Sequence, residues 1–312
     1  MSAVAKAPQS PSKAKVFVRR LTSTTLLWAV VLAAMFSGNA LVSDIVFTCF
    51  VSVFATVGLL EFYHLAEKRG LACFKIVGMV AGLVLTLLVA APSAGWLGTV
   101  RHPAQVNDLE SAWLALVVLG LCVRQLYAKS SPSGLIAIAT TLLGLLYVPW
   151  LLNFFQKINF FPGLNGNGKF FVLYFILVTK FSDTGAYAIG SLIGKHKLIP
   201  RVSPAKTWEG FVGAIAVATG ASVVYVHFLQ DKMPGMTLPH AIVLGIFLSA
   251  TAVIGDLIES IFKREAGVKD SGHFFPGIGG ILDLLDSLLF NAPLMYLYMR
   301  YVLALGEPGL SP

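Results

Sequence analysis

The chain has 312 residues, of which 56% are hydrophobic and only 12% are charged, and its mean hydropathy is +0.79. Soluble domains carry about 25% charged residues, so this composition excludes an ordinary soluble protein and indicates a surface that mostly faces lipid. The net charge of +8 has a topological explanation, given below, and does not indicate a nucleic-acid partner.

The apolar segments predict an all-α polytopic membrane protein. Residues 1–20 are rich in Pro, Ser and Lys, and we expect a disordered tail rather than a cleavable signal peptide. A membrane-spanning helix needs about 20 mostly apolar residues, and about nine segments approach this length. They lie at 21–38, 41–62, 71–92, 109–127, 133–153, 169–193, 208–229, 240–262 and 284–304.

The distribution of basic residues predicts the orientation of these spans. With a cytosolic N-terminus, 17 of the 23 Lys and Arg residues fall on the inner side, five fall outside and Lys180 lies within a span. This bias is the one expected for short cytosolic loops. We therefore expect a multi-pass protein of the inner cell membrane, with an N-terminal bundle of about five spans over 21–165 and a catalytic domain of about four over 166–312.

Polar residues interrupt the apolar pattern first near Lys180 and Asp183, which share a helix face inside the sixth span. Charges inside a span are costly, so this pair either neutralises itself or contributes Asp183 to a polar site. A basic segment follows, in which we expect Ser203 to cap a helix that has Pro204 at its first position. Lys206 and Thr207 lie there, and the segment is either a phosphate site or an ordinary cytosolic loop.

A third group lies at the cytosolic end of the eighth span. Asp256, Glu259, Ser260 and Lys263 follow at helical spacing, which places them on one stripe of the helix. The stripe is followed directly by Arg264. Carboxylates in such a stripe are difficult to explain as lipid-facing, although helix packing alone is an alternative.

The fourth group combines glycines and carboxylates. Gly277, Gly279 and Gly280 allow close approach of the backbone to a phosphate, and a helix is expected to begin there. Asp283 and Asp286 then lie on one face of that helix. Carboxylate oxygens suit hard cations such as Mg²⁺, which also bind phosphate oxygens. His273 is either a general acid or a structural donor.

These motifs resemble the phosphatidate cytidylyltransferase family. The resemblance rests on the segments 183–187, 203–210, 260–270 and 276–286, and it is strongest over 180–290. The family usually has histidine at the position of Ile278 and arginine at that of Leu284, so this chain departs from the pattern at two potential phosphate contacts. The resemblance implies the conversion of CTP and phosphatidate to CDP-diacylglycerol and diphosphate, with Mg²⁺ alone or with a second cation, and commonly a homodimer.

The same resemblance assigns roles to the polar residues. We expect metal binding by Asp256, Asp283 and Asp286, and phosphate contacts from Lys263, Arg264 and Lys269. The complete expected set is as follows: catalytic Asp256, Lys263, Arg264, Lys269, Asp270 and Asp283; substrate-binding Asp183, Ser203, Lys206, Thr207, Ser260, His273, Gly277, Gly279 and Gly280.

Three other functions stay open from the sequence. A CTP-dependent lipid or polyprenol kinase would use similar groups, and the residues Ile278 and Leu284 are compatible with an inactive or divergent paralogue. A transporter fits less well, because the polar residues gather at one side and no matching pair of interrupted spans is present.

Overall fold

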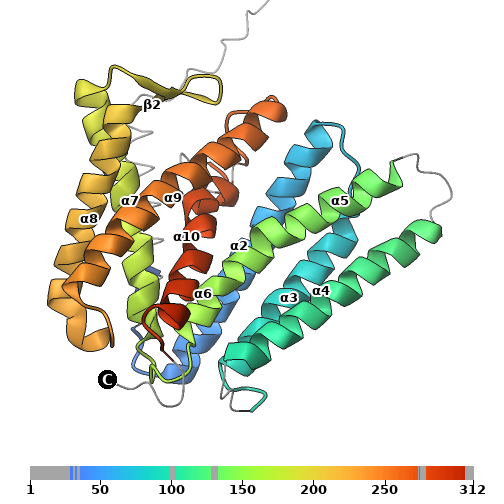
Figure 1. Ribbon diagram of the computed structural model, residues 1–312. Coiled ribbons are helices and arrows are strands. Elements are labelled where there is room, and N and C mark those ends of the chain that lie inside the picture. Colours follow the sequence, from blue (N-terminus) through green and yellow to red (C-terminus); the bar gives the residue numbers. More distant parts are fainter. Residues whose placement is uncertain are drawn as a thin grey trace, which may run out of the picture.

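The structure is a computed structural model that describes residues 29–30, 32–33, 36–98, 103–127, 133–272, 274 and 279–305. It is a bundle of long helices with one short β-hairpin (Figure 1). The elements are α2 (Ala40–Lys68), α3 (Lys75–Ser93), α4 (Pro103–Leu126), α5 (Gly134–Leu145), the π-helical turn η1 (Leu146–Trp150), α6 (Leu151–Asn159), α7 (Gly168–Ile193), β1 (Lys197–Ile199), β2 (Ser203–Thr207), α8 (Trp208–Leu229), the 3₁₀ turn η2 (Gln230–Lys232), α9 (Leu238–Glu265) and α10 (Ile281–Tyr301).

Within the described part of the chain, eight helices are long and apolar enough to cross a membrane. They correspond to the second to ninth predicted spans, so the all-α polytopic fold is confirmed. The first predicted span, 21–38, lies largely outside the described residues. The fifth span continues to Asn159 because α5, η1 and α6 form one helix. Pro149 lies in its wider π turn, and since proline has no N–H, it cannot complete a regular helical hydrogen bond there.

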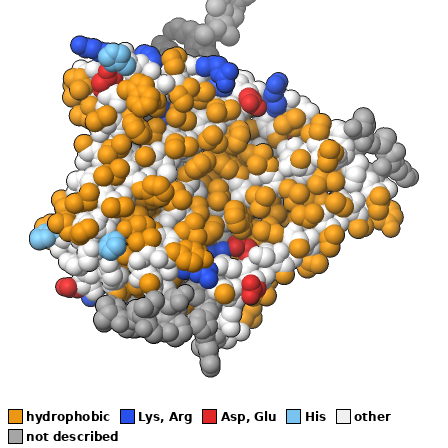
Figure 2. All heavy atoms as spheres, in the orientation of Figure 1, with side chains coloured by type: hydrophobic (Ala, Val, Ile, Leu, Met, Phe, Trp, Pro, Cys, Tyr) orange, Lys and Arg blue, Asp and Glu red, His pale blue; other side chains and the backbone are white. Residues whose placement is uncertain are grey.

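The outer surface of the bundle is apolar, as a lipid-facing surface requires. Figure 2 shows hydrophobic side chains over most of one face, while charged side chains gather towards the two ends. Leu119 and Leu192, for example, are 62% and 80% exposed. The interior is rich in aromatic residues, and Tyr63, Phe171 and Tyr174 are completely buried. One hydrophobic core joins residues of α2, α6, α7, α8, α9 and α10.

The connections sort into two groups at opposite ends of the bundle (Figure 1). The C-terminal ends of α2 and α9 and the β-hairpin lie at one end. The C-terminal end of α3 and the α6–α7 and α8–α9 connections lie at the other. This grouping agrees with the predicted alternation of the spans. We call the first end the site end, because the polar residues considered below gather there.

Helices α7 and α8 pack closely because small residues line their contact. A Cβ atom at Gly185 would lie 2.7 Å from the carbonyl oxygen of Gly213, and one at Gly210 would lie 2.9 Å from that of Ala186. Glycines at such positions let two membrane helices approach backbone to backbone. The close pair carries the β-hairpin and so fixes one wall of the site.

A buried ion pair lies near the opposite end of the bundle. Lys157 is one of the five basic residues that the charge count placed on the outer side, and it lies in α6. It is 6% exposed and pairs with Glu110 of α4, which is 4% exposed. Asn153 donates a hydrogen bond of 3.4 Å to the same carboxylate. The pair explains how two charges are accommodated between helices of the apolar bundle.

Removing one partner of this pair is expected to destabilise the protein. Lys157→Met leaves Glu110 buried without its cation, and we expect the free energy of unfolding to fall by about 3–5 kcal/mol. Thermal unfolding in detergent measures the effect. The double variant Glu110→Gln/Lys157→Met is expected to recover most of the loss. If the double variant is as unstable as Lys157→Met alone, the charge pairing is not the cause.

Candidate active site

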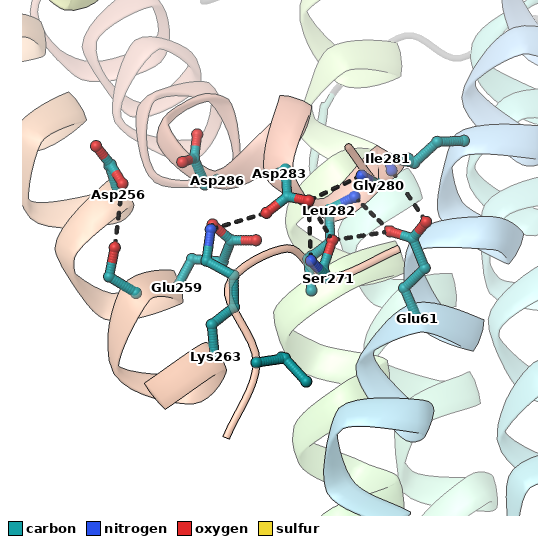
Figure 3. A network of polar contacts seen from close by, with 12 residues as sticks. Glu61, Asp256, Glu259, Lys263, Ser271, Gly280, Ile281, Leu282, Asp283 and Asp286 are labelled. Carbon is teal, nitrogen blue, oxygen red and sulfur yellow. Dashed lines mark hydrogen bonds and ion pairs between the residues drawn. The ribbon is translucent and has the colours of Figure 1, made fainter. Parts of the chain in front are cut away.

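Three carboxylates converge at the site end, between the last three turns of α9 and the first turns of α10. Asp256 and Glu259 come from α9, and Asp286 comes from α10 (Figure 3). One oxygen from each lies within 4.8 Å of the others. Glu259 is fully buried and Asp286 is 8% exposed. The helical spacing that predicted the α9 stripe is confirmed, because Ser260 Oγ donates to Asp256 and Lys263 Nζ to Glu259.

The donor set suits a hard divalent cation. All three groups offer carboxylate oxygens, the ligands that Mg²⁺ prefers. Glu259 Oε1 is buried and has no hydrogen-bond partner among the described residues. A buried carboxylate oxygen without a donor is costly, and a cation between the three groups would satisfy it. The residues present therefore fit a divalent ion.

Two lysines form ion pairs with members of the acidic group. Lys206 of β2 pairs with Asp256 at 2.7 Å. Lys263 pairs with Glu259 at 2.5 Å and with Asp283 of α10 at 2.8 Å. The site thus places two ammonium groups beside a potential cation site, an arrangement that suits the binding of several phosphate groups.

Asp283, predicted as a metal ligand, lies beyond Lys263 and binds the beginning of its own helix. Its Oδ2 atom accepts hydrogen bonds from the backbone N–H groups of Ser271 and Gly280, at 2.9 and 2.8 Å, and from Ser271 Oγ at 2.9 Å. Its Oδ1 atom pairs with Lys263. The structure therefore shows Asp283 as a cap of α10, and Glu259 takes the place beside Asp256 and Asp286 that the sequence analysis gave to Asp283.

A pocket of about 450 Å³ adjoins the acidic group. Its walls come from α7, the hairpin, α8 and α9, and Asp256 lies at its edge. Among the predicted site residues, the pocket is lined by Asp183, Ser203, Lys206, Thr207 and Asp256. Apolar residues, including Ala186, Leu198 and Phe211, line much of the rest. The pocket has the mixed lining and size of a small-ligand site.

The local structure around Ser203 corrects one prediction. Ser203–Thr207 forms strand β2, which pairs antiparallel with β1, and the following helix begins only at Trp208. Thr207 is its N-cap, with Oγ1 accepting from the N–H of Gly210 at 3.1 Å. The expected N-cap at Ser203 was wrong because Pro204 is equally compatible with an edge strand, and both strands of a two-stranded hairpin are edges.

The family of the chain follows from comparison with known proteins. A model of the cytidylyltransferase family matches residues 19–302, which is most of the chain. The chain belongs to the cytidylyltransferase family. The resemblance found over 180–290 therefore extends into the N-terminal bundle.

Individual relatives match this chain over different lengths. A phosphatidate cytidylyltransferase of Bacillus subtilis is 31% identical over 271 residues, covering 87% of this chain and 95% of that protein. One of Staphylococcus saprophyticus is 34% identical over 240 residues, covering 76% and 85%. One of Haemophilus influenzae is 41% identical over 138 residues, a match that spans 44% of this chain and about half (48%) of that protein.

Other residues predicted for this cytidylyltransferase family member lie in different surroundings. Arg264, Lys269 and Asp270 are exposed, and Arg264 donates to the carbonyl of Val268 at 3.2 Å. Lys180 pairs with Asp183 at 3.5 Å and donates to the carbonyl of Leu284 at 3.3 Å. Gly279 has a positive φ of 117°, which favours glycine, and Gly280 precedes α10. His273 and Gly277 lie outside the described residues, as does Ile278.

Glu61 is the principal site residue that the sequence analysis missed. It lies near the C-terminal end of α2 and is 6% exposed. Its carboxylate accepts hydrogen bonds from the N–H groups of Ile281 and Leu282, at 3.1 and 2.8 Å, and from Ser271 Oγ at 3.2 Å. An acidic residue in an apolar span is the available signal, because such a residue usually faces a polar interior.

Proposed function

We propose that this protein transfers the cytidylyl group of CTP to phosphatidate, giving CDP-diacylglycerol and diphosphate. The proposal rests mainly on one observation: Asp256, Glu259 and Asp286 converge beside a pocket at one end of a membrane bundle. Lys206 and Lys263 pair with members of this group. Relatives named phosphatidate cytidylyltransferase that align with most of the chain support this substrate pair.

The reaction needs positioning and charge neutralisation more than an activated side chain. A phosphate oxygen of phosphatidate, already anionic at neutral pH, forms a bond to the α-phosphorus of CTP. The bond from that phosphorus to the bridging oxygen of the β-phosphate breaks, and the electron pair leaves with diphosphate. Holding both anions in line lowers the barrier, and cationic groups near the leaving phosphates stabilise the charge that develops there.

The residues divide this work by position. Asp256, Glu259 and Asp286 would hold Mg²⁺, which supplies positive charge to the phosphate oxygens when bound. Lys206 faces the pocket beside Asp256 and orients a phosphate there. Lys263 holds Glu259 and Asp283 in place through its two ion pairs. Asp183, Ser203 and Thr207 line the same pocket, so they are candidate contacts to substrate.

The location of the site suits a water-soluble nucleotide and a lipid substrate. The acyl chains of phosphatidate remain in the bilayer, against apolar helix faces, while the headgroup reaches the pocket from the side. The charge bias of the connections supports a cytosolic site end, where CTP is available. The orientation follows from the positive-inside rule and is part of this proposal.

Position-specific labelling of CTP tests the reaction class. Purified protein in detergent is incubated with phosphatidate, Mg²⁺ and CTP that carries ³²P at either the α or the γ position. We expect the α label in the lipid product and the γ label in diphosphate. A γ label in the lipid would instead establish a lipid kinase, and a lipid free of both labels would establish an inactive paralogue.

Omission of the metal is a separate arm of the same assay. Treatment with EDTA is expected to abolish the transfer, and added Mg²⁺ is expected to restore it, because carboxylates alone cannot neutralise the phosphates. Full transfer in EDTA would overturn the metal assignment but leave the reaction class intact.

A further inference from the structure

The residue at the N-cap of helix α10 has no side chain that could accept a hydrogen bond. Its N-cap is Gly280, whereas most helices have Ser, Thr, Asp or Asn there to accept a hydrogen bond from the first turn. The first N–H groups of a helix have no partner inside the helix. In this protein the N–H groups of Ile281 and Leu282 donate to Glu61, which comes from α2, more than 200 residues earlier in the chain.

The chain on both sides of the segment 273–278 lies against the same carboxylate. A Cβ atom at Gly272 would collide with Glu61 Oε1, and one at Gly280 would collide with Glu61 Oε2. Ser271 Oγ also donates to Glu61. Glu61 therefore holds together the residues that precede and follow this segment, and the two glycines permit the close approach.

Hydrogen bonds and ion pairs connect Glu61 to the acidic group (Figure 3). Ser271 Oγ lies within hydrogen-bond distance of Glu61 and of Asp283, so its single proton serves one carboxylate at a time. Asp283 pairs with Lys263, and Lys263 pairs with Glu259. A continuous polar path thus runs from α2 through the first turn of α10 to the carboxylates on α9.

We propose that Glu61 is a positioning residue of the active site. Its negative charge suits the positive end of α10 and fixes the first turn of that helix. Asp286 lies about one turn further along, so its position relative to Asp256 and Glu259 depends on where α10 begins. This inference rests on the proposed function, and it assigns the N-terminal bundle a part in building the metal site.

The test compares Glu61→Gln with Glu110→Gln, a matched loss of a buried carboxylate at the opposite end of the bundle. Two experiments are carried out on each protein. The first measures kcat and KM for CTP at saturating phosphatidate, per folded molecule. The second measures the rise in thermal midpoint on titration with Mg²⁺ alone, without substrates, which reports cation binding by mass action.

For Glu61→Gln we expect kcat to fall by about 10-fold or more, with a smaller change in KM. The Mg²⁺ concentration that gives half of the maximal rise in thermal midpoint is expected to increase by about 10-fold or more. Groups outside the ligand set that orient the metal ligands have effects of about 10–100-fold. Glu110→Gln is expected to lower stability and to leave kcat, KM and the response to Mg²⁺ unchanged. Ser271→Ala, which removes only a hydroxyl, is expected to shift the same quantities less and in the same direction. It decides the question if Glu61→Gln cannot be purified in folded form.

A Glu61→Gln protein with wild-type kcat and wild-type Mg²⁺ response overturns the inference and leaves the proposed function standing. So does a protein that is less stable but otherwise behaves as Glu110→Gln does. A wild-type protein that transfers no cytidylyl group overturns the proposed function instead. In that case the Mg²⁺ titration still tests the role of Glu61. If the inactive wild type also shows no response to Mg²⁺, the proposed function and the inference about Glu61 are both overturned.

Discussion

Asp286→Asn is expected to lower the rate of cytidylyl transfer by about 10²–10³-fold, the scale found when a group that stabilises transition-state charge is removed. The side chain is 8% exposed, and one of its oxygens lies within 4.8 Å of an oxygen of Asp256 and of Glu259. Asparagine keeps the shape and one oxygen but removes the negative charge, so the affinity for a divalent ion falls. Diphosphate release at saturating CTP and phosphatidate measures the effect.

Stability separates this loss of function from misfolding. Without a cation, three neighbouring carboxylates repel one another, so removing one charge is expected to leave the thermal midpoint in EDTA unchanged or higher. Glu67→Gln provides the control, because Glu67 is exposed and pairs with Lys75 at the same end of the bundle. A fully active Asp286→Asn protein would contradict the assignment of Asp286 as a metal ligand.

Lys263→Met is expected to reduce both stability and activity. Lys263 is the cation between Glu259 and Asp283, whose side chains are 0% and 11% exposed. Its removal leaves the buried Glu259 and the half-buried Asp283 without their cation, and we expect the free energy of unfolding to fall by about 3–5 kcal/mol. The rate is expected to fall by about 10²-fold or more, because the capped end of α10 and the acidic group both lose their support.

Arg264→Met is the matched control for this variant. Arg264 is the next residue in α9, but it is exposed and donates only to the carbonyl of Val268 among the contacts described. We expect less than 0.5 kcal/mol of change in stability, the usual range for such surface positions, and near-normal activity. Equal effects at both positions would show that the overall positive charge of this helix end matters and that the buried bridge does not.

The spans and the polar stripe of α9 could be predicted because they depend on local periodicity. Apolar runs of about 20 residues predict helices, and Asp256, Glu259 and Lys263 share a face by helix geometry alone. Helix α10 beginning after the glycines was predicted for the same reason. The predicted alternation of the spans agrees with the arrangement of the helix ends in the structure (Figure 1).

The partners across the bundle could not be predicted, because periodicity gives the face of a helix but not the helix that faces it. Glu61 and Leu282 are 221 residues apart, and nothing local relates them. Asp283 and Asp286 looked equivalent, yet Asp283 binds Ser271 and Gly280 while Asp286 joins the α9 carboxylates. The hairpin was missed because Ser203-Pro204 fits a helix start and an edge strand equally well.

The long separation between Glu61 and its partners has a consequence for biosynthesis. Ile281 follows Glu61 by 220 residues, and at about 5–20 residues per second this distance takes roughly 10–45 s to translate. Throughout that interval the Glu61 carboxylate of α2 is present, but the N–H groups of α10 that donate to it have not yet been synthesised. The ribosome completes six further spans before α10 emerges, so the last helix to be inserted completes a contact prepared by one of the first.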